Sequence, residues 1–555
     1  MWCRYLLVTR RFHHSSRPLE KQLKEIEDFF NQKRFANVKR PYAPIDVLKH
    51  RGSLGQHNPP PLSSEISKNL FELLESHFKE GKPLHTLGVL DPIQMTQLAR
   101  CPDIKVAYVS GWACSSNANE NVSPDFGDYP YDTVPNQVGR IFNAQQLHDK
   151  KNYLQNFSKN TADRGSATDI NYMKPIIADA DMGHGGITTV MKLAKMFAEK
   201  GASAIHLEDQ LVGSKKCGHL SGTVVVPTST HLQRLVTTRF QWDLMAAENL
   251  VIARTDSCNS KLISSTIDPR DHRHIQGIIP KSSARPLNEL LLELENSSAD
   301  TDSLLSLEEE WYHKNKIMTF DETVAQKFTD TEFSLYLSEK KKLMDRVLKK
   351  EYLSLREMKA VAEKVNPRKI IEFDWDYPRT KEGHYMFNGC LEAAIERSKI
   401  FAPYSDLIWL ETKTPDLKQA RNFSKIIHEI YPDVKFVYNL SPSFNWTSQG
   451  FDQVQLKNFI WDLAKEGFIL QLVSLAGLHA NGISFWQLAN EFQFDGMASY
   501  VKNVQSVEKK TNCDLLTHQK WSGIEYVESV ANVVQNGASS KMTSIGGDSF
   551  TENQF

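Results

Sequence analysis

Eight short apolar runs, each ending in polar or charged residues, constrain the fold of this chain more than any other feature. The runs cover residues 85–91, 104–111, 175–181, 203–209, 249–256, 405–411, 434–441 and 468–474. Helical patterns lie between most of them, such as GGITTVMKLAKMFAEKG at 185–201. Because buried parallel strands are nearly continuous apolar runs, eight strand–helix units predict an α/β fold, a (β/α)8 barrel of the TIM type.

Other segments do not follow this alternation of strand and helix. Residues 21–84 predict an N-terminal helical region, and residues 491–555 predict a helical C-terminal tail. Residues 281–368 are rich in charge and show helical apolar spacing, which predicts a helical subdomain inserted between barrel segments 85–280 and 369–490. A packing or assembly role is the simplest interpretation of this insertion.

Composition excludes some classes of function. Lys and Arg number 66 against 67 Asp and Glu, so the chain lacks the basic excess of most nucleic-acid-binding proteins. No apolar run approaches the ~20 residues of a membrane span. The seven cysteines are widely spaced and form no CxxC pair, which favours a reducing compartment over a disulfide framework or a zinc site.

The first twenty residues, MWCRYLLVTRRFHHSSRPLE, differ from the rest of the chain. They hold four arginines and two serines, and no acidic residue precedes Glu20. This profile predicts a mitochondrial presequence over residues 1–20, processed somewhere after Phe12. The alternative is an ordinary basic tail.

Polar side chains gather where the apolar runs end. They are Ser110, Asp179, Asp181, Glu208, Arg254, Glu411, Asn439, Ser441 and Ser474. One polar strand end is explained by a strand that runs into solvent. In a barrel, however, all these ends share the face that carries active sites, so their number predicts an active site there.

Four carboxylates predict a metal site. Asp179 and Asp181 are two residues apart at a strand end and point to the same side, and Glu208 ends the next run. Asp125 lies in the loop after SGW. Oxygen ligands without a His or Cys set favour Mg2+, with Mn2+ as a substitute. Helix capping or salt bridging is the alternative for any single acid.

The stretch SKKCGHLSG suggests an activated thiol on a loop. Lys215, Lys216 and His219 place positive charge around Cys217, which predicts a lowered thiol pKa and a thiolate. The small residues around it, Gly218 among them, allow the loop to close over a ligand. The alternative is a spare thiol in a surface loop.

Donors for carboxylate oxygens complete the set. Arg254 in ARTD can hold a carboxylate with two parallel hydrogen bonds. Asn439, Ser441 and Ser443 in NLSPSFNW add further donors. The ligand that these groups fit is a polycarboxylate beside a divalent cation.

The ordered motifs SGW, ADADMGHGG, HLEDQ, KKCGHL, VIARTD, LIWLET, YNLSPSFNW and LAGLHA resemble the isocitrate lyase family, within the isocitrate lyase/PEP mutase superfamily. The resemblance extends from about residue 25 to the end. It implies a TIM-type barrel, a Mg2+ site and reversible carbon–carbon cleavage of a 2-hydroxy tricarboxylate. It also implies a homotetramer with swapped helices.

Roles for individual residues follow from the same resemblance. It implies that Cys217 is the acid/base thiol with His219 beside it, and that Tyr108 is a candidate base for the substrate hydroxyl. Metal is then held, partly through water, by Asp179, Asp181, Glu208 and Asp125. The substrate site comprises Ser110, Gly111, Trp112, Gly218, His219, Arg254, Glu411, Asn439, Ser441, Ser443, Leu472 and Ser474.

Two departures from the usual family pattern bear on the substrate. Isocitrate lyases usually carry Phe and Thr where this chain has Leu472 and Ser474, and the smaller pair resembles the 2-methylisocitrate lyase branch. A pocket that must admit one extra methyl group needs this room. KKCGHL in place of KKCGHM and the predicted presequence point the same way.

We therefore predict cleavage of 2-methylisocitrate to pyruvate and succinate, in the methylcitrate cycle of propionate breakdown in the mitochondrial matrix. The alternative is an isocitrate lyase that yields glyoxylate and succinate. A catalytically silent relative would have lost the thiol or a metal-binding acid, and this chain has all of them.

Overall fold

The structure is a computed structural model that describes residues 18–52, 59–157, 170–280, 284–346, 352–537, 543–544 and 551–555. Residues 1–17, nearly all of the predicted presequence, lie outside the described residues.

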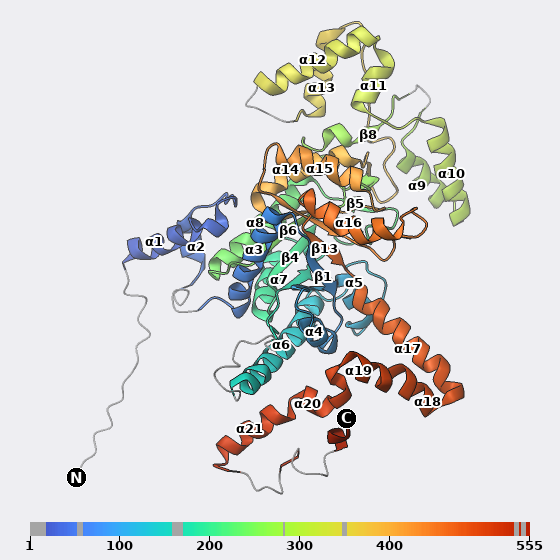
Figure 1. The fold of residues 1–555 in the computed structure, drawn as a ribbon. Helices are drawn as coiled ribbons and strands as arrows, with labels where there is room; N and C mark the ends of the chain where they lie inside the picture. Colours follow the sequence, from blue (N-terminus) through green and yellow to red (C-terminus); the bar gives the residue numbers. More distant parts are fainter. Residues whose placement is uncertain are drawn as a thin grey trace, which may run out of the picture.

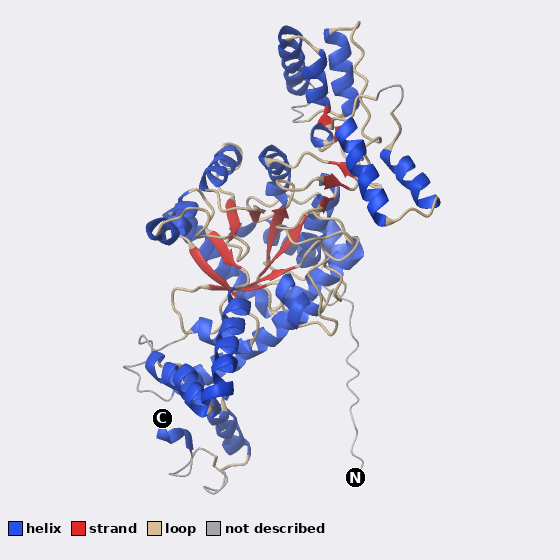
Figure 2. Cartoon of the chain, turned by 90° about the vertical axis from the view of Figure 1, so that its right-hand side faces the viewer, coloured by secondary structure: helices blue, strands red, loops and turns tan. Residues whose placement is uncertain are grey.

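Eight parallel strands close into a barrel (Figure 2). In chain order they are β1 (Leu84–Gly88), β2 (Val106–Val109), β3 (Ile176–Asp179), β4 (Ala204–Glu208), β6 (Leu250–Thr255), β11 (Leu407–Leu410), β12 (Lys435–Asn439) and β13 (Leu470–Val473). Around the ring the order is β1-β13-β12-β11-β6-β4-β3-β2, so the first and last strands pair. The predicted (β/α)8 TIM-type fold is confirmed.

Helices of the barrel layer follow the strands and cover their outer faces. They are α4 (Pro92–Ala99), α5 (Gly111–Asn117), α6 (Thr133–Phe157), α7 (Ile187–Lys200), α8 (Thr228–Leu244), α14 (Leu391–Phe401), α15 (Leu417–His428) and α16 (Gln453–Lys465). Gly201 ends α7 in the left-handed conformation, as the sequence KG at the end of the helical pattern suggests.

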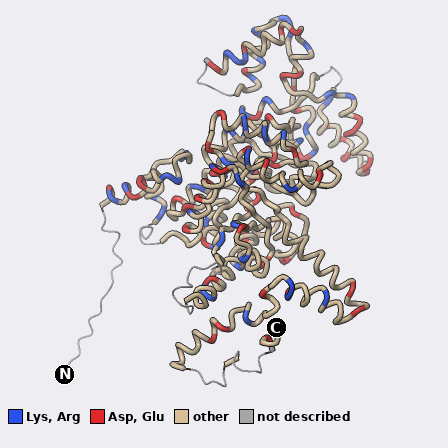
Figure 3. The backbone as a smooth tube through the Cα atoms, viewed as in Figure 1, with Lys and Arg blue, Asp and Glu red and all other residues tan. Residues whose placement is uncertain are grey.

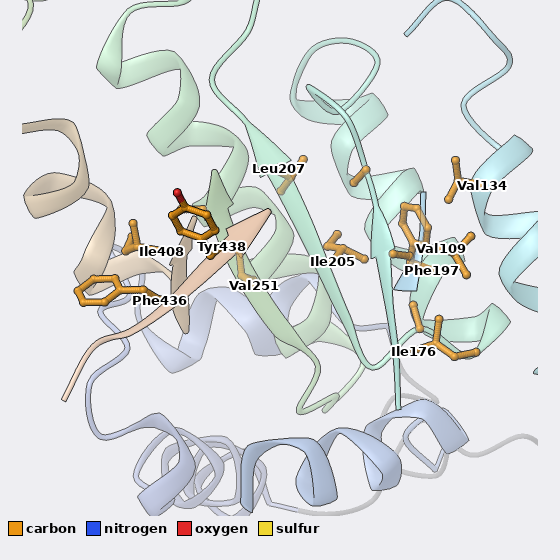
Figure 4. Packing of buried hydrophobic residues seen from close by; sticks show 14 of the residues in the cluster. Val109, Val134, Ile176, Phe197, Ile205, Leu207, Val251, Ile408, Phe436 and Tyr438 are labelled. Carbon is orange, nitrogen blue, oxygen red and sulfur yellow. The ribbon is translucent and has the colours of Figure 1, made fainter. Parts of the chain in front are cut away.

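Alternating side chains of the strands build two apolar layers. In β3, Ile176 joins the outer cluster between strands and helices, whereas Ile177 joins the cluster inside the barrel. Figure 4 shows the outer cluster, in which Ile205 and Val251 lie on neighbouring strands with Ile176 nearby. Both faces of each strand are therefore buried, which explains why the strands are continuous apolar runs.

The N-terminal helices pack beside and beneath the barrel. They are α1 (Leu19–Phe30), α2 (Pro44–His50) and α3 (Leu62–Glu80). Leu70 and Leu74 of α3 belong to the inner apolar cluster, so α3 closes the amino-terminal end of the barrel. A buried ion pair of 2.6 Å between Arg34 and Asp406 attaches the preceding segment to the foot of β11.

A helical insertion lies between β6 and β11. Its helices are α9 (Leu287–Asn296), α10 (Thr301–Lys314), α11 (Phe320–Lys327), α12 (Asp330–Arg346) and α13 (Leu355–Val365), and they extend away from the barrel at the top of Figure 1. Two apolar clusters of its own, one around Phe320 and Tyr336 and one around Leu287 and Trp311, hold it together. Lys or Arg and Asp or Glu positions are interspersed along the chain of this insertion (Figure 3).

Short strands join the insertion to the barrel. β5 (Val224–Val225), β7 (Leu262–Ile263) and β10 (Tyr385–Met386) form a three-stranded sheet. β8 (Gln276–Gly277) pairs with β9 (Met318–Thr319).

The C-terminal tail is helical, as predicted. Helix α17 (Ala476–Asp495) projects from the barrel in Figure 1. It is followed by α18 (Met497–Tyr500), a π-helical turn (Val501–Gln505), α19 (Ser506–Thr511), α20 (His518–Ser522) and α21 (Ile524–Val534). Ile483, Phe485 and Trp486 of α17 are each more than half exposed, which leaves an apolar surface on this helix.

None of the described helices is both long and apolar enough to cross a membrane. The six cysteines within the described ranges are free thiols.

Candidate active site at the carboxyl end of the barrel

A cavity of about 270 Å³ lies at the carboxyl end of the barrel strands. Most of the predicted site residues line it: Tyr108, Ser110, Trp112, Asp125, Asp179, Cys217, Gly218, His219, Arg254, Glu411, Asn439, Ser441, Ser443 and Ser474. Seven barrel strands or the loops after them contribute, because parallel strands in a barrel bring their carboxyl ends to one face.

A larger cavity, of about 600 Å³, lies at the other end of the barrel, between α3 and the segments that lead into β2 and β3. Its walls carry no comparable set of carboxylates, thiol and imidazole, so the smaller cavity is the better candidate for chemistry.

Four predicted residues do not line the cavity. Gly111, Asp181 and Glu208 lie directly behind its wall: the Gly111 N–H donates to Asp179 at 3.0 Å, and the Asp181 N–H donates to the same carboxylate at 2.9 Å. Leu472 is fully buried in the apolar cluster inside the barrel, below the cavity. Leu472 therefore does not contact the cavity in which a ligand would bind.

The carboxylates of the site surround a buried lysine. Lys215 Nζ forms ion pairs with Asp125 and Asp181, and lies 4.0 Å from Glu208. Although burial alone would lower the pKa of Lys215, these carboxylates outweigh it and raise the pKa well above its ordinary value. The lysine that the sequence places beside the thiol is thus the counter-ion of the acidic cluster.

Negative charge exceeds positive charge in this cluster, and this excess affects the pKa values of its carboxyl groups. Burial and neighbouring carboxylates raise the pKa of Asp125 to about 6, raise the pKa of Asp179, and raise that of Glu208 well above its usual range. Asp181 differs: despite its burial, Lys215 and His184 hold its pKa well below the usual range.

Whether these acids fit a divalent cation can be tested on their unsatisfied oxygens. Among the described residues, no three carboxylate, imidazole or thiol side chains form a ready-made metal site. Yet both side-chain oxygens of Glu208 and Oδ1 of Asp125 are buried without a hydrogen-bond donor. Buried acceptors beside a lysine suit a Mg2+-type cation, which takes few direct protein ligands and keeps several waters.

Backbone strain marks the same place. Asp181 and His184 adopt positive φ angles of 47° and 54°, a region that residues other than glycine rarely occupy. His184 Nε2 lies 3.3 Å from Asp181 Oδ2, and the Tyr129 hydroxyl donates to the same oxygen. The turn after β3 therefore holds Asp181 in a fixed orientation at some conformational cost.

Arg254 is held by three carboxylates. Its guanidinium pairs with Asp256 through two hydrogen bonds of 2.9 and 3.1 Å, and Nη1 lies 3.2 Å from Glu208. Nε lies 3.9 Å from Glu411. The predicted bidentate pair exists, but its partner is Asp256, so a ligand carboxylate has to compete with or add to this network.

The Cys217 loop packs against this network. A side-chain carbon at Gly218 would lie 2.7 Å from Glu411 Cγ and 3.1 Å from Arg254 Nη2, so only glycine permits this approach. His219 lies 3.6 Å from Glu411, with its ring edge-on to Phe444. The loop thus brings Cys217 to the cavity wall.

The prediction of a lowered pKa and a thiolate at Cys217 is wrong. Burial raises the pKa of Cys217, and Glu411 raises it further. Lys215, the expected activator, is directed toward the acidic cluster instead. A thiol that keeps its proton near neutral pH is suited to donating a proton to a substrate.

Tyr108 is also better suited to donating than to accepting. Its hydroxyl lies 3.3 Å from Asp179 and 2.9 Å from His206 Nε2. Burial and Asp179 raise the pKa of Tyr108 well above its ordinary value, so a free phenolate base is not available. Burial lowers the pKa of His206, which leaves a neutral imidazole beside the phenol.

Polar contacts also connect the far wall. Ser474 donates to Asn439 at 3.1 Å, and Asn439 lies 3.4 Å from Glu411. Trp409 donates to Glu411 at 2.8 Å. This chain of contacts holds the amide and carboxylate groups in place around the cavity.

Comparison with known proteins agrees with this geometry. Residues 22–555 match the sequence pattern of the isocitrate lyase family. The chain belongs to the isocitrate lyase family.

Individual relatives differ in their sequence identity to this isocitrate lyase family member. The mitochondrial 2-methylisocitrate lyase of Saccharomyces cerevisiae is 62% identical, over 96% of this chain and 92% of that protein. A mitochondrial 2-methylisocitrate lyase of Hypocrea atroviridis is 46% identical, over 97% and 94%. The isocitrate lyase of Saccharomyces cerevisiae is 40% identical, over 97% and 96%.

Several cavity residues of this family member were missed from the sequence. They are Trp409, Pro442, Leu475, Leu478 and His479, with Lys215 in its ion-pairing role. His479 stands in the LAGLHA motif just after β13, so its place after a strand end was the available signal. Trp409 gave no such signal, because an aromatic residue within an apolar run is more often part of the hydrophobic core.

Proposed function

We propose that this protein cleaves 2-methylisocitrate to pyruvate and succinate. The observation that carries the proposal is the cavity in which Cys217, Arg254 and the acidic cluster meet at the carboxyl end of a lyase-family barrel. The substrate is chosen on sequence: two of the relatives named 2-methylisocitrate lyase are 62% and 46% identical to this chain, against 40% for the isocitrate lyase of Saccharomyces cerevisiae.

Binding of the substrate depends on charge. Arg254 and the donors Asn439, Ser441 and Ser443 are proposed to hold substrate carboxylates. The acidic cluster would repel a tricarboxylate unless a cation balanced it. We assign this role to Mg2+, with Mn2+ as a substitute, held by Asp125, Asp179, Asp181 and Glu208 partly through water.

When bound, such a cation polarises the substrate oxygens that it contacts and offsets their charge. The protein supplies the proton transfers. The substrate hydroxyl is proposed to give its proton to the Tyr108 oxygen while Tyr108 passes its own to Asp179, which lies 3.3 Å away and whose carboxyl group has a raised pKa. The adjacent carbon–carbon bond then breaks, and the 2-oxo acid pyruvate forms.

The bonding electrons remain on the carbon of the second fragment. Cys217 is proposed to donate its proton to that carbon, which gives succinate. The raised pKa of Cys217 keeps the proton available for this step. Closure of the loop around Gly218 would exclude water while the carbon is reactive.

The cellular setting and assembly are proposed on similar grounds. Mitochondrial relatives and the basic, acid-poor residues 1–20 support import into the matrix. The exposed apolar side chains of α17 support a homotetramer in which helices of neighbouring subunits cover one another.

The direct test offers purified protein with Mg2+ each substrate separately and identifies the keto acid. Pyruvate from 2-methylisocitrate is expected at a kcat/KM well above that for glyoxylate from isocitrate. A kcat/KM for isocitrate equal or greater would refute the substrate assignment and favour an isocitrate lyase. No turnover of either would refute the lyase mechanism in this protein.

A further inference from the structure

A second cysteine with catalytic-type surroundings lies outside the cavity. Cys390 directly precedes α14, and its Sγ lies 3.9 Å from His274 Nδ1. The other ring nitrogen of His274, Nε2, lies 2.8 Å from Glu396 Oε2. A thiol, an imidazole and a carboxylate are thus connected in series, with the carboxylate orienting the imidazole toward the sulfur.

Three features favour a pair of charged side chains in this cluster, a Cys390 thiolate and a protonated His274. Although burial alone would lower it, Cys390 and Glu396 raise the pKa of His274 to about 9. Although burial opposes the thiolate, His274 and the backbone N–H of Ala393 lower the pKa of Cys390. Cys390 is also the residue directly before the N-terminus of α14, an eleven-residue helix, where the helix dipole favours negative charge.

Other charges around the cluster leave this balance in place. Glu392, on the exposed side of α14, disfavours the thiolate. Arg273 pairs with Glu396, and Lys399 also lowers the pKa of that carboxyl group. The cluster therefore keeps Glu396 ionised, so that it can support a positive His274.

Exposure to solvent differs between Cys390 and His274. Cys390 is partly exposed, whereas His274 is buried at 6% exposure. Phe387 and Ala393 form the apolar side of the site. Buried structural cysteines are inert, but a partly exposed thiolate in a fixed orientation is reactive.

We propose that Cys390, with His274 and Glu396, is a second reactive thiol of this protein and a site of modification by small-molecule disulfides. The Cys390 thiolate attacks one sulfur of the disulfide. The sulfur–sulfur bond of the reagent breaks, a new one forms to Cys390 Sγ, and the other half leaves with the electron pair as a thiolate. That thiolate takes a proton from His274 or water, so no other oxidant is needed.

This site is distinct from the cavity thiol. Burial raises the pKa of Cys217, raises that of Cys258 to about 11, and strongly raises that of Cys114. These three keep their protons near neutral pH, whereas His274 lowers the pKa of Cys390 and so increases its thiolate fraction. The cavity thiol donates a proton, and Cys390 acts as a nucleophile.

The test measures disulfide exchange cysteine by cysteine. Full-length protein with Mg2+, first reduced and then freed of reductant, is exposed to hydroxyethyl disulfide at about pH 6.5, where an ordinary thiol is only about one per cent ionised. Adducts on each cysteine peptide are followed by mass spectrometry. We expect Cys390 to react at least about tenfold faster than the exposed Cys101.

Two substitutions on the same helix provide matched variants. Glu396→Gln removes the carboxylate that orients His274 and should slow Cys390 by about tenfold at this pH. Glu392→Gln removes a nearby exposed carboxylate that disfavours the thiolate and should leave the rate equal or faster. His274→Gln should slow it at least as much as Glu396→Gln.

The proposal is overturned if Cys390 reacts no faster than Cys101, if Cys217 carries the adduct instead, or if Glu396→Gln leaves the rate at Cys390 unchanged. Should His274→Gln fail to fold, the rates of the unmodified protein between about pH 6 and 9 decide, since a rate profile at Cys390 that lies at lower pH than the profile at Cys101 supports the proposal and a coincident profile refutes it. None of these readouts depends on lyase turnover.

Discussion

Cys217 presents the clearest prediction for a single residue. Cys217→Ser replaces the thiol by a hydroxyl that is a far weaker acid, so we expect substrate binding to persist while kcat falls about 10²- to 10⁴-fold. Calorimetric binding and steady-state turnover measure the two effects. Cys101→Ser, at an exposed thiol far from the cavity, is the control. Near-normal turnover in Cys217→Ser would remove Cys217 from the mechanism.

The raised pKa of Cys217 also sets a pH dependence. In the proposed mechanism the active form is the protonated thiol, which is present below the pKa of Cys217 and lost as the pH rises through it. Because burial raises this pKa above the ordinary 9.0, the alkaline limb of kcat/KM is expected above about pH 9. A limb near pH 7 that disappears in Cys217→Ser would contradict this assignment.

Substrate choice can be separated between two residues that the sequence treats as a pair. Ser474 lines the cavity, so Ser474→Thr adds a methyl group to its wall and should shift kcat/KM toward isocitrate by about tenfold or more. Leu472 is buried inside the barrel, so Leu472→Phe should mainly overpack that cluster and lower the free energy of unfolding by about 1–3 kcal/mol.

Kinetics with both substrates and thermal unfolding of both variants distinguish the two effects. A shift in preference in Leu472→Phe alone, with Ser474→Thr unchanged, would show that the size of the site is set from inside the barrel.

At the scale of residues, the sequence locates strand-end side chains well and their pairing poorly. Glu208 and Asn439 were predictable because parallel strands in a barrel end on one face. The pairing of Lys215 with the acidic cluster was not predictable, since a lysine beside a thiol could equally lower the pKa of that thiol. Leu472 was misplaced because residues two apart on a barrel strand both point inward, yet only the upper one reaches the cavity.

The loop that carries Cys217 connects the cavity thiol to the acidic cluster proposed to hold the cation. Lys215 is its buried anchor in the acidic cluster, and Lys216 its neighbour, whose backbone pairs with the Gln210 side chain. Lys215→Met leaves buried carboxylates without their cation, a change that costs about 3–5 kcal/mol of unfolding free energy when one partner of a buried pair is lost.

Added Mg2+ should restore much of that loss, because a cation bound only by the folded state stabilises it. Thermal unfolding with and without Mg2+ should therefore show a larger Mg2+-dependent rise in Tm for Lys215→Met than for the unmodified protein. Lys216→Met, on the same loop, is the matched control and should resemble the unmodified protein. Equal Mg2+ responses in all three would argue against a cation site at these acids.

At the scale of elements, the strands were predictable and the connections less so. Each predicted run matches one barrel strand, although β1 begins one residue before its run, because a strand buried on both faces cannot alternate polar and apolar residues. The short sheets at the base of the insertion, such as β5 with β7, gave no such signal. Two-residue strands are set by tertiary contacts, which local composition does not encode.

For the molecule as a whole, the order of the barrel strands follows from their order in the chain, whereas its contacts with other copies do not. The apolar pattern of α17 could have indicated a buried core helix. In one chain it is exposed instead, with Phe485 and Trp486 at 69% and 62% exposure. An exposed apolar patch of this kind indicates a partner surface.

Substitution on α17 tests the proposed tetramer. Phe485→Asp combined with Trp486→Asp places charge on this surface, so burial against a neighbouring subunit becomes costly and the assembly should dissociate. Light scattering coupled to size-exclusion chromatography measures the mass, with a tetramer expected for the unmodified protein and a smaller species for the variant. Leu335→Asp, at a half-exposed leucine of α12 in the insertion, is the control and should stay tetrameric. A monomeric unmodified protein, or a variant of unchanged mass, would mean that α17 serves another contact.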